Sequence, residues 1–534
     1  MYYLYHLAEN IIMDINPKFT FPLSQSDVLM SAIDNLHNEE PIVSKHTEVL
    51  KRMLKQFKRI DFNSRAFEEY DKLLEQYEDE NTVDKEKLIK KISKFKLLDK
   101  HYYICCIDEI QNIAQSNDWD IVQYNDDIYL FNEHYWQKVE LNVFQIFLSD
   151  VAKVLGVPPI IEKHHGFREN LYKQFVATQI FATPELKPKE VYVNLLDNTL
   201  QVTDGEVNVF PFDKEQFLTY QLPYAYNSDA ECPMFLRFLN EVLPDESAQQ
   251  VLAEYLGYLF IKNGNKSIKA EKLLVLYGSG ANGKSVVFEI ILALLGQENV
   301  SNYSLTSLTD STGYYRAQIS NKLVNYGSEI GGKLEADMLK KMASGEPIEA
   351  RQPYGRPLLL HEYAKLIFNC NQLPKDVEQT DAYFRRFLIL PFNVTIEEEN
   401  QDKLLASKII ESELPGILNW VLEGLKRLLE QGKFTKCKIS EDVLNRYKIE
   451  SDSVQMYLEE YNIQKSLDSK KYEPLKIVYE VYRKFCVESG YKSLNKSNFT
   501  KRLESLKFSL ERRNIGKVVF LSTPLEKVFL QGLV

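Results

Sequence analysis

The segment LLVLYGSGANGKSVVFEIILALLG, residues 273–296, joins an apolar run to a glycine-rich turn and a second apolar run. Its centre, residues 278–285, matches the pattern G-x-x-x-x-G-K-[ST]. The five residues before it predict a buried strand, and residues 285–295 predict a helix that Gly296 ends. In this setting, backbone N–H groups and the positive end of the helix dipole face a phosphate. The segment therefore predicts a nucleoside triphosphate site.

The chemistry of this loop gives its residues distinct roles. The Lys284 ammonium is expected to reach the terminal phosphates of ATP, and the Ser285 hydroxyl is expected to ligate Mg²⁺. Glycines let the backbone turn toward the phosphate without a side chain in the way. The residues that we expect to bind ATP are Gly278, Ser279, Gly280, Ala281, Asn282, Gly283, Lys284 and Ser285.

Polar side chains adjoin three further apolar runs downstream of the loop. KLVNYGSEI carries Glu329 after a predicted strand, where a carboxylate could hold Mg²⁺ or orient water. KLIFNCNQLP ends another predicted strand at Asn371, whose amide could hydrogen-bond water or the last phosphate. DAYFRRFLILPF places Arg385 and Arg386 before a further strand, and guanidinium groups suit the charge on a phosphoryl group during transfer. These four residues are the predicted catalytic partners of Lys284.

Apolar strand-like runs alternate with helical patterns between about residues 272 and 392, which predicts a mainly parallel sheet between helices. Residues 44–100 are Lys/Glu-rich with helical periodicity, and residues 104–201 mix short strands with helices. Residues 470–534 read as helix, helix and hairpin, the pattern of a winged helix. We therefore expect four domains: an N-terminal helical region (1–105), an α+β module (106–262), an α/β P-loop ATPase core (263–445) and a winged-helix-like DNA-binding domain (446–534).

Composition limits the classes of partner. The 534 residues are 44% hydrophobic and 26% charged, with a net charge of −11, which argues against a protein that coats nucleic acid or membrane. Residues 470–534 nevertheless hold 14 Lys/Arg against six Glu, a net charge of +8, which leaves −19 on the rest. DNA is therefore expected to be bound at local basic patches.

The start of the chain and its cysteines indicate the compartment. The first residues lack a basic n-region, and no apolar run is long enough to span a bilayer, so we expect a cytoplasmic protein that does not bind membranes. The six cysteines are scattered, which predicts reduced thiols. The acid pairs Asp118/Asp120 and Asp126/Asp127 are interpreted as turn residues rather than as a metal site.

The order GSGANGKS, GSE, LKKMASGEPIEAR, FNCNQLP and FRRFLILPF is similar to that of the superfamily 3 helicases. Specifically, it resembles the poxvirus-type and phage/plasmid primase-helicase C-terminal family, over about residues 110–440. The resemblance implies an AAA+-like ATPase that forms a hexameric ring and moves along one DNA strand, typically 3′ to 5′. It implies that Glu329 stands at Walker B, that Asn371 is the sensor amide, and that Arg386, with Arg385 second, is the finger completing a neighbouring subunit's site.

The resemblance also implies contacts beyond the phosphate loop. Lys340 or Lys341 would reach the nucleotide across the subunit interface. A DNA-gripping hairpin would lie in RQPYGRPLLLHEY, where Arg351 and Arg356 would meet phosphates and Tyr354 would meet a base or sugar.

Together these features predict an ATP- and Mg²⁺-dependent replicative DNA helicase of a phage, plasmid or other mobile element in a bacterial host. It would act as a homo-hexamer on single-stranded and forked DNA, with a separate primase or replication initiator as a further partner. One alternative is an origin-binding initiator or helicase-loading ATPase that unwinds little. Another is a P-loop small-molecule kinase, which the basic C-terminal segment disfavours.

Overall fold

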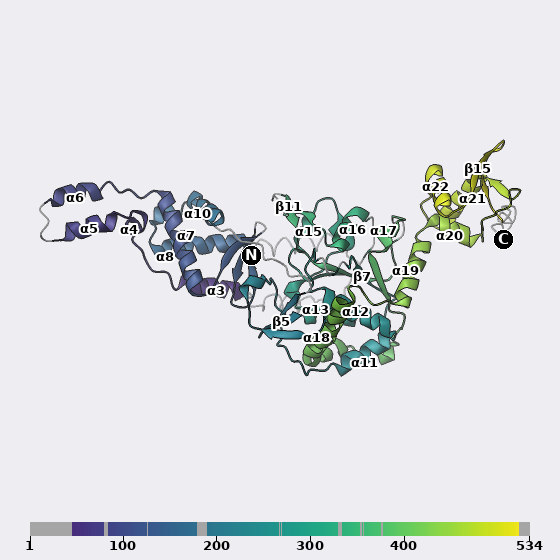
Figure 1. The fold of residues 1–534 in the computed structure, drawn as a ribbon, viewed down its shortest axis with the longest axis horizontal. Coiled ribbons are helices and arrows are strands. Elements are labelled where there is room, and N and C mark those ends of the chain that lie inside the picture. Colours follow the sequence, from purple (N-terminus) through teal and green to yellow (C-terminus); the bar gives the residue numbers. More distant parts are fainter. Residues whose placement is uncertain are drawn as a thin grey trace, which may run out of the picture. The chain divides into compact units, whose positions relative to one another are not determined.

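The structure is a computed structural model that describes residues 45–79, 84–124, 127–178, 190–265, 268, 270–328, 330, 334–352, 355, 357–374 and 378–522. The chain forms two compact units, whose helices and strands are labelled in Figure 1. One comprises residues 1–113 and 145–171, and the other comprises residues 114–144 and 172–534. Within the described ranges, no helix is both long and apolar enough to cross a membrane.

The first unit is helical in its described parts, in agreement with the periodicity of residues 44–100. Its aromatic core brings Phe57 against Phe147 at 6.5 Å and Phe62 against Tyr102 at 4.8 Å between ring centroids. The helices that lie wholly or partly in this unit are α3 (Lys45–Leu54), α4 (Phe62–Ala66), α5 (Tyr70–Glu78), α6 (Lys85–Ile92), α7 (Asp99–Ser116), α8 (Leu141–Leu155), α9 (Pro159–Glu162) and α10 (His165–Thr178).

The second unit begins with two small antiparallel sheets, as the strand-like runs of residues 104–201 predict. The strands are β1 (Ile121–Tyr124), β2 (Asp127–Phe131) and β3 (Trp136–Val139), then β4 (Val191–Asn194), β5 (Thr199–Val202) and β6 (Val207–Phe210). Lys214 Nζ pairs with Asp118 at 2.8 Å and with Asp120 at 2.9 Å. These two acids therefore have a structural partner. Asp126 lies outside the described residues.

A five-stranded parallel sheet forms the core of the second unit and confirms the predicted mixed α/β fold. Its strands are β7 (Leu273–Tyr277), β8 (Val300–Ser301), β9 (Val324–Gly327), β12 (Lys365–Cys370) and β13 (Phe387–Pro391), in the order β13-β7-β12-β9-β8. Numbered by their order along the chain, neighbouring strands of this sheet are therefore the fifth, first, fourth, third and second. The connections reverse direction beside β7, and ligands of open parallel sheets bind at such a switch point, beyond the carboxyl ends of the strands.

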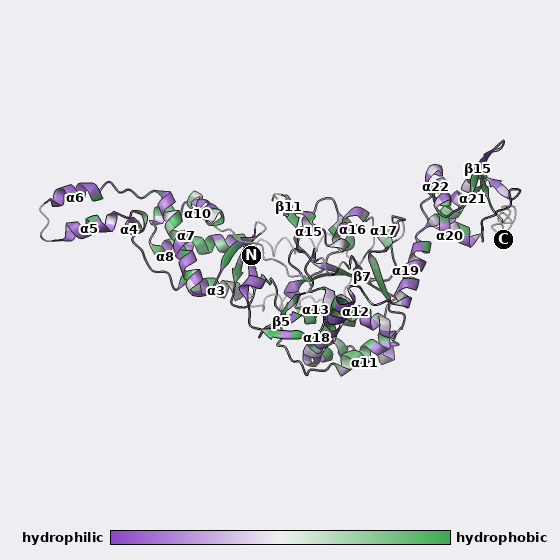
Figure 2. Ribbon diagram, viewed as in Figure 1, coloured by the Kyte–Doolittle hydropathy of each residue, from purple (hydrophilic) through white to green (hydrophobic). Residues whose placement is uncertain are grey.

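Both faces of this sheet are covered, which explains the unbroken apolar runs (Figure 2). Leu274 and Leu276 of β7 pack into one hydrophobic cluster, and Leu273 and Val275 pack into another. The helices of this part are α11 (Pro233–Val242), α12 (Glu246–Tyr258), α13 (Lys284–Leu295), α14 (Leu305–Thr309), α15 (Tyr314–Ala317), α16 (Ala336–Ser344), α17 (Asp381–Phe384), α18 (Leu405–Gln431) and α19 (Lys438–Glu450). The antiparallel pair β10 (Ile348–Arg351) and β11 (Pro357–Leu360) stands outside the sheet.

The C-terminal segment has its own hydrophobic cluster. The predicted order of helix, helix and hairpin is confirmed as far as residue 522. The elements are α20 (Ser453–Glu460), β14 (Tyr472–Pro474), α21 (Leu475–Glu488), α22 (Lys496–Ser505), β15 (Leu510–Arg513) and β16 (Gly516–Phe520). The three strands form an antiparallel sheet in the order β14-β16-β15.

Candidate functional site

The glycine-rich loop of residues 278–283 leads directly from the end of β7 into α13. The Gly278 N–H donates to Cys370 O on β12 at 3.1 Å, and the Ile396 N–H donates to Ala281 O at 2.7 Å. Ala281 and Gly283 adopt left-handed backbone conformations, with φ of 56° and 82°. The loop is therefore fixed to the strand on one side and to the segment after β13 on the other.

Two glycines of the loop sit where a side chain would not fit. A Cβ on Gly278 would lie 2.3 Å from Phe392 O, and one on Gly283 would lie 2.7 Å from Val242 Cγ1. Since both contacts are below van der Waals distance, these positions exclude other residues. The backbone can therefore form a tight cradle at the amino end of α13.

Lys284, the first residue of α13, turns back into this cradle. Its Nζ donates to Gly278 O, Ser279 O and Asn282 Oδ1, each at 2.8 Å. Burial lowers the pKa of the Lys284 ammonium. Because the ammonium is held by three acceptors inside the loop, phosphate oxygens could replace them with little movement of the helix. This donor set fits a polyphosphate.

Asn282 ties the loop to Phe392, the residue that follows β13. It is buried, with 3% of its surface exposed, and its Nδ2 donates to Phe392 O at 2.9 Å. Its Oδ1 is one of the three acceptors of Lys284. Sequence reasoning placed Asn282 in the loop but missed this bridge, because the pattern leaves the position before the second glycine open.

One predicted catalytic partner, Asn371, follows a strand that neighbours β7, at the same edge of the sheet as the glycine-rich loop. Asn371 is exposed and directly follows β12, whose last residue, Cys370, pairs in register with Tyr277 of β7. Ser328 follows β9 on the other side of β12. Glu329, the predicted Walker B acid and Mg²⁺ ligand, lies outside the described residues. Ser285, the other predicted Mg²⁺ ligand, is exposed in the first turn of α13.

The two arginines lie at the opposite edge of the sheet. The Leu273 N–H donates to Arg386 O at 2.8 Å, so both arginines sit at the amino end of β7, five residues upstream of the loop. This separation is roughly 15 Å along the strand. Arg386 is 6% exposed, and its Nη2 contacts Ser344 Oγ at 3.0 Å and Glu271 Oε2 at 3.3 Å. The Arg385 side chain is 61% exposed. Neither arginine reaches the loop of its own chain.

The two lysines of α16 differ in their partners. Lys340 Nζ pairs with Asp337 at 2.8 Å and with Glu378 at 2.9 Å, and its hydrogen bonds to these two acids raise its pKa. Lys341 is exposed, and its ammonium has no ion-pair partner in the described part of the chain. Of the two lysines, Lys341 is therefore the one whose ammonium is more available to bind a ligand or a second subunit.

The predicted hairpin is present as β10 and β11, which pair from Ile348 with Leu360 to Arg351 with Pro357. Arg351 is exposed, and its Nε donates to Gly355 O at 3.3 Å across the turn. Tyr354 and Arg356 lie outside the described residues. The hairpin therefore forms where the sequence places it, with Arg351 at its end.

A cavity of about 600 Å³ opens at the amino edge of the sheet, away from the glycine-rich loop. Lys365, Lys262 and Glu362 line it together with several aromatic residues. Burial lowers the pKa of Lys365 to about 8, and burial also raises the pKa of Glu362. These ionisable groups carry no motif, and sequence reasoning missed them.

Comparison with protein families matches three parts of the chain. Residues 96–244 match a family described as D5 N terminal like, and residues 449–519 match one described as Poxvirus D5 protein-like. Residues 276–386, which include the loop and the hairpin, match a family of unknown function, DUF5906.

Two viral relatives match part of the chain. "Putative helicase L207/L206" of Acanthamoeba polyphaga mimivirus is 26% identical over 168 residues, which are 29% of this chain and 16% of that protein. "Putative helicase 184R" of Invertebrate iridescent virus 6 is 24% identical over 231 residues, 37% of this chain and 23% of that protein. The matched stretches thus span less than a quarter of either relative. Among solved structures, the apo C-terminal region of NrS-1 is 12% identical, covers 77% of this chain and 98% of that chain, and has a TM-score of 0.43.

Proposed function

The chain belongs to the poxvirus D5-type primase-helicase family, and from this premise we propose that it is an ATP-driven replicative DNA helicase. The family and the relatives' names indicate a helicase-like role in replication. The finer proposal is that a hexameric ring of this chain unwinds duplex DNA by moving 3′ to 5′ on one strand.

The glycine-rich loop carries the proposal of ATP hydrolysis. In the proposed complex, the loop N–H groups and the Lys284 ammonium bind the phosphates, exchanging the three acceptors that Lys284 now has. Ser285 and Glu329 would hold Mg²⁺, which supplies charge neutralisation at the phosphates. Asn371, next to the loop, would orient the attacking water. Because Lys284 itself is buried, its ammonium would interact more strongly with phosphate than an exposed lysine would.

The position of the arginines supports a ring. Since Arg385 and Arg386 lie at the edge of the sheet opposite to their own loop, this pair could act on a transferred phosphoryl group only at the loop of another subunit. We propose Arg385 for this role in place of Arg386. Both arginines contact Glu271, but the Arg385 side chain is exposed, whereas Arg386 is buried and also donates to Ser344. Lys341 is proposed as a second contact across the interface.

DNA is proposed to contact two regions. One is the β10–β11 hairpin through Arg351, together with Tyr354 and Arg356, which stand between the two strands in the sequence. The other is the C-terminal segment, in which α21, α22 and the β15–β16 hairpin support a winged helix. Four basic side chains on α22 and this hairpin are exposed: Lys496, Lys501, Arg512 and Lys517. The excess of basic residues here suits a phosphate backbone.

The direct test is strand displacement by the purified chain. We expect the protein to separate a forked duplex only with ATP and Mg²⁺, and Lys284→Ala to abolish both ATP turnover and unwinding. DNA-stimulated ATP turnover without strand displacement would instead indicate an initiator or a helicase loader. ATP turnover that DNA does not change would refute the helicase proposal.

A further inference from the structure

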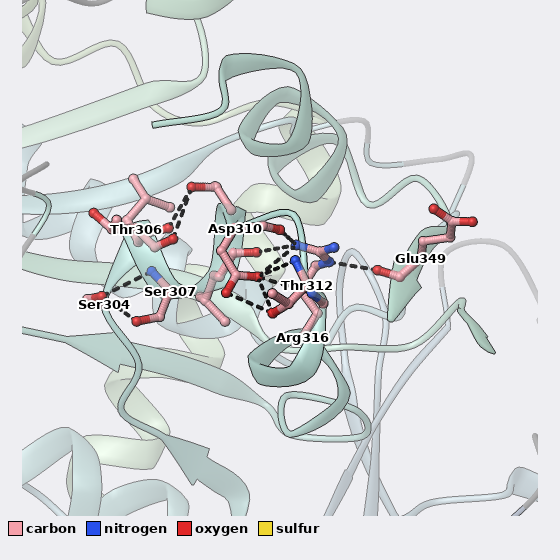
Figure 3. Close-up of polar contacts among 11 residues, drawn as sticks. Ser304, Thr306, Ser307, Asp310, Thr312, Arg316 and Glu349 are labelled. Atoms are coloured by element: carbon pink, nitrogen blue, oxygen red, sulfur yellow. Dashed lines mark hydrogen bonds and ion pairs between the residues drawn. The ribbon is translucent and has the colours of Figure 1, made fainter. Parts of the chain in front are cut away.

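Arg316 is a buried arginine between the central sheet and the β10–β11 hairpin. It belongs to α15 and has 4% of its surface exposed. Its Nη1 donates to Leu308 O at 2.9 Å and to Asp310 O at 2.6 Å, while its Nε donates to Glu349 O at 2.6 Å (Figure 3). Leu308 and Asp310 belong to α14 and the turn after it, whereas Glu349 is in β10. One guanidinium therefore joins two separate segments of backbone.

A second contact fastens the same strand to the same turn. The Arg351 N–H of β10 donates to Gly313 O at 3.1 Å. Gly313 has a φ of 76°, and a Cβ there would lie 3.0 Å from the Arg316 guanidinium. Asp310 Oδ1 accepts from the N–H groups of Thr312 and Gly313 at 3.1 and 3.0 Å, which holds the turn in shape (Figure 3). The turn thus supports the edge of β10 that does not pair with β11.

The segment before α14 is tied to the sheet. Asn325 of β9 is fully buried, and its Oδ1 accepts from the Tyr303 N–H at 2.9 Å. Its Nδ2 donates to Tyr303 O at 2.8 Å. Tyr303 precedes α14, which Ser304 caps. A continuous series of contacts therefore runs from β9, through α14 and Arg316, to β10, and β9 is the strand that leads to Glu329.

From this geometry we propose that Arg316 is a positioning residue that fixes the hairpin to the central sheet. The proposal rests on the proposed helicase function for its consequence, which is that Arg316 makes movement of the sheet move the hairpin. A two-stranded hairpin has little stability of its own, so its position depends on such supports together with the packing of Ile348, Ala350 and Leu360 into the hydrophobic cluster of the sheet. An arginine suits this role because its planar donors reach carbonyls on both sides, whereas lysine presents a single ammonium.

The test compares Arg316→Met and Arg316→Lys with a matched control, Arg427→Met. Arg427 on α18 also bridges helices, through Nε to Glu254 Oε1 at 2.6 Å, and it is not part of the site. Hydrogen exchange of the β10 and β11 amides reads the position of the hairpin without ATP or DNA. We expect exchange at least about tenfold faster in Arg316→Met, because three carbonyls lose a buried donor. Exchange in β7 should not change, Arg316→Lys should restore part of the protection, and Arg427→Met should leave the hairpin as in wild type.

The enzymatic consequence is measured separately. In Arg316→Met, we expect ATP turnover without DNA to stay within about twofold of wild type and unwinding to fall at least about tenfold, since only the hairpin is released. Unchanged exchange in β10 and β11 would overturn the positioning role, as would an equal effect of Arg427→Met. If wild type itself unwinds nothing while Arg316→Met still accelerates exchange, the positioning role stands and the helicase function fails.

Discussion

Asn282→Asp is the substitution that tests the arrangement of the phosphate loop most sharply. Asn282 accepts from Lys284 Nζ through Oδ1 at 2.8 Å and donates through Nδ2 to Phe392 O at 2.9 Å. An aspartate keeps the acceptor, adds a negative charge beside the lysine and loses the donor. A carboxylate oxygen then faces the Phe392 carbonyl at hydrogen-bond distance.

Two effects follow, and their sizes can be worked out. Loss of the buried hydrogen bond to Phe392 O lowers the free energy of unfolding by about 1–3 kcal/mol. The added charge repels each phosphate charge by about 3 kcal/mol, for a separation of roughly 6 Å and an effective dielectric constant of ~20. Solvent on the open side of the loop screens part of this repulsion, so ATP affinity should fall between about ten- and 100-fold.

The assay is equilibrium binding of a fluorescent ATP analogue, with denaturant unfolding measured in parallel. Asn282→Ala is the control, because it loses the same donor without adding charge. We expect a similar loss of stability from both variants and a much larger loss of ATP affinity from Asn282→Asp. If the Asn282→Asp protein is folded and binds ATP as tightly as wild type, the loop does not bind the phosphates.

Three further outcomes are expected. Arg385→Ala and Lys284→Ala proteins should each turn over little ATP. Mixing them should restore measurable turnover, because the intact loop of an Arg385→Ala subunit can then meet the intact Arg385 of a Lys284→Ala subunit. No gain in turnover on mixing would argue against a site shared between subunits. The pKa of Lys365 is lowered to about 8 in the folded protein from an ordinary 10.5. Above pH 8 the unfolded state therefore binds more protons than the folded state, and the free energy of unfolding should rise by about 2 kcal/mol between pH 7.5 and 9.5. Denaturant titrations of Lys365→Met should lack this increase in the free energy of unfolding. An identical pH dependence in wild type and variant would contradict the lowered pKa of Lys365. The double variant Lys496→Gln/Lys501→Gln should bind DNA more weakly than wild type. In fluorescence anisotropy titrations, its slope of log K against log salt concentration should be shallower by up to about 2, because two phosphate contacts are lost. An unchanged slope would show that α22 is not part of the DNA interface.

The central part of the fold could be predicted because its strands are buried on both faces. Their unbroken apolar runs and the glycine-rich loop identify β7 and α13 with boundaries shifted by a single residue, Lys284. The hairpin was expected from the resemblance to the superfamily 3 helicases, and its strands pair around the segment that the resemblance indicated. The order of the five strands was not, because it depends on which faces the helices cover.

The arginines show where sequence reasoning reached its limit. Arg385 and Arg386 are adjacent and chemically identical, and both contact Glu271, more than a hundred positions away, yet the Arg385 side chain is exposed and the Arg386 side chain is buried. Arg316 has no motif around it, and its partners are backbone carbonyls that no sequence pattern marks. Burial and long-range pairing therefore determine which of several plausible side chains remain available for function.

The most direct test of the account is strand displacement from a forked duplex with a 3′ tail, followed in real time with wild-type protein and with Lys284→Ala. The account predicts ATP-dependent separation of the strands by wild type and no separation by the variant. ATP hydrolysis by wild type without any separated strand, under conditions in which the protein binds the fork, would contradict it.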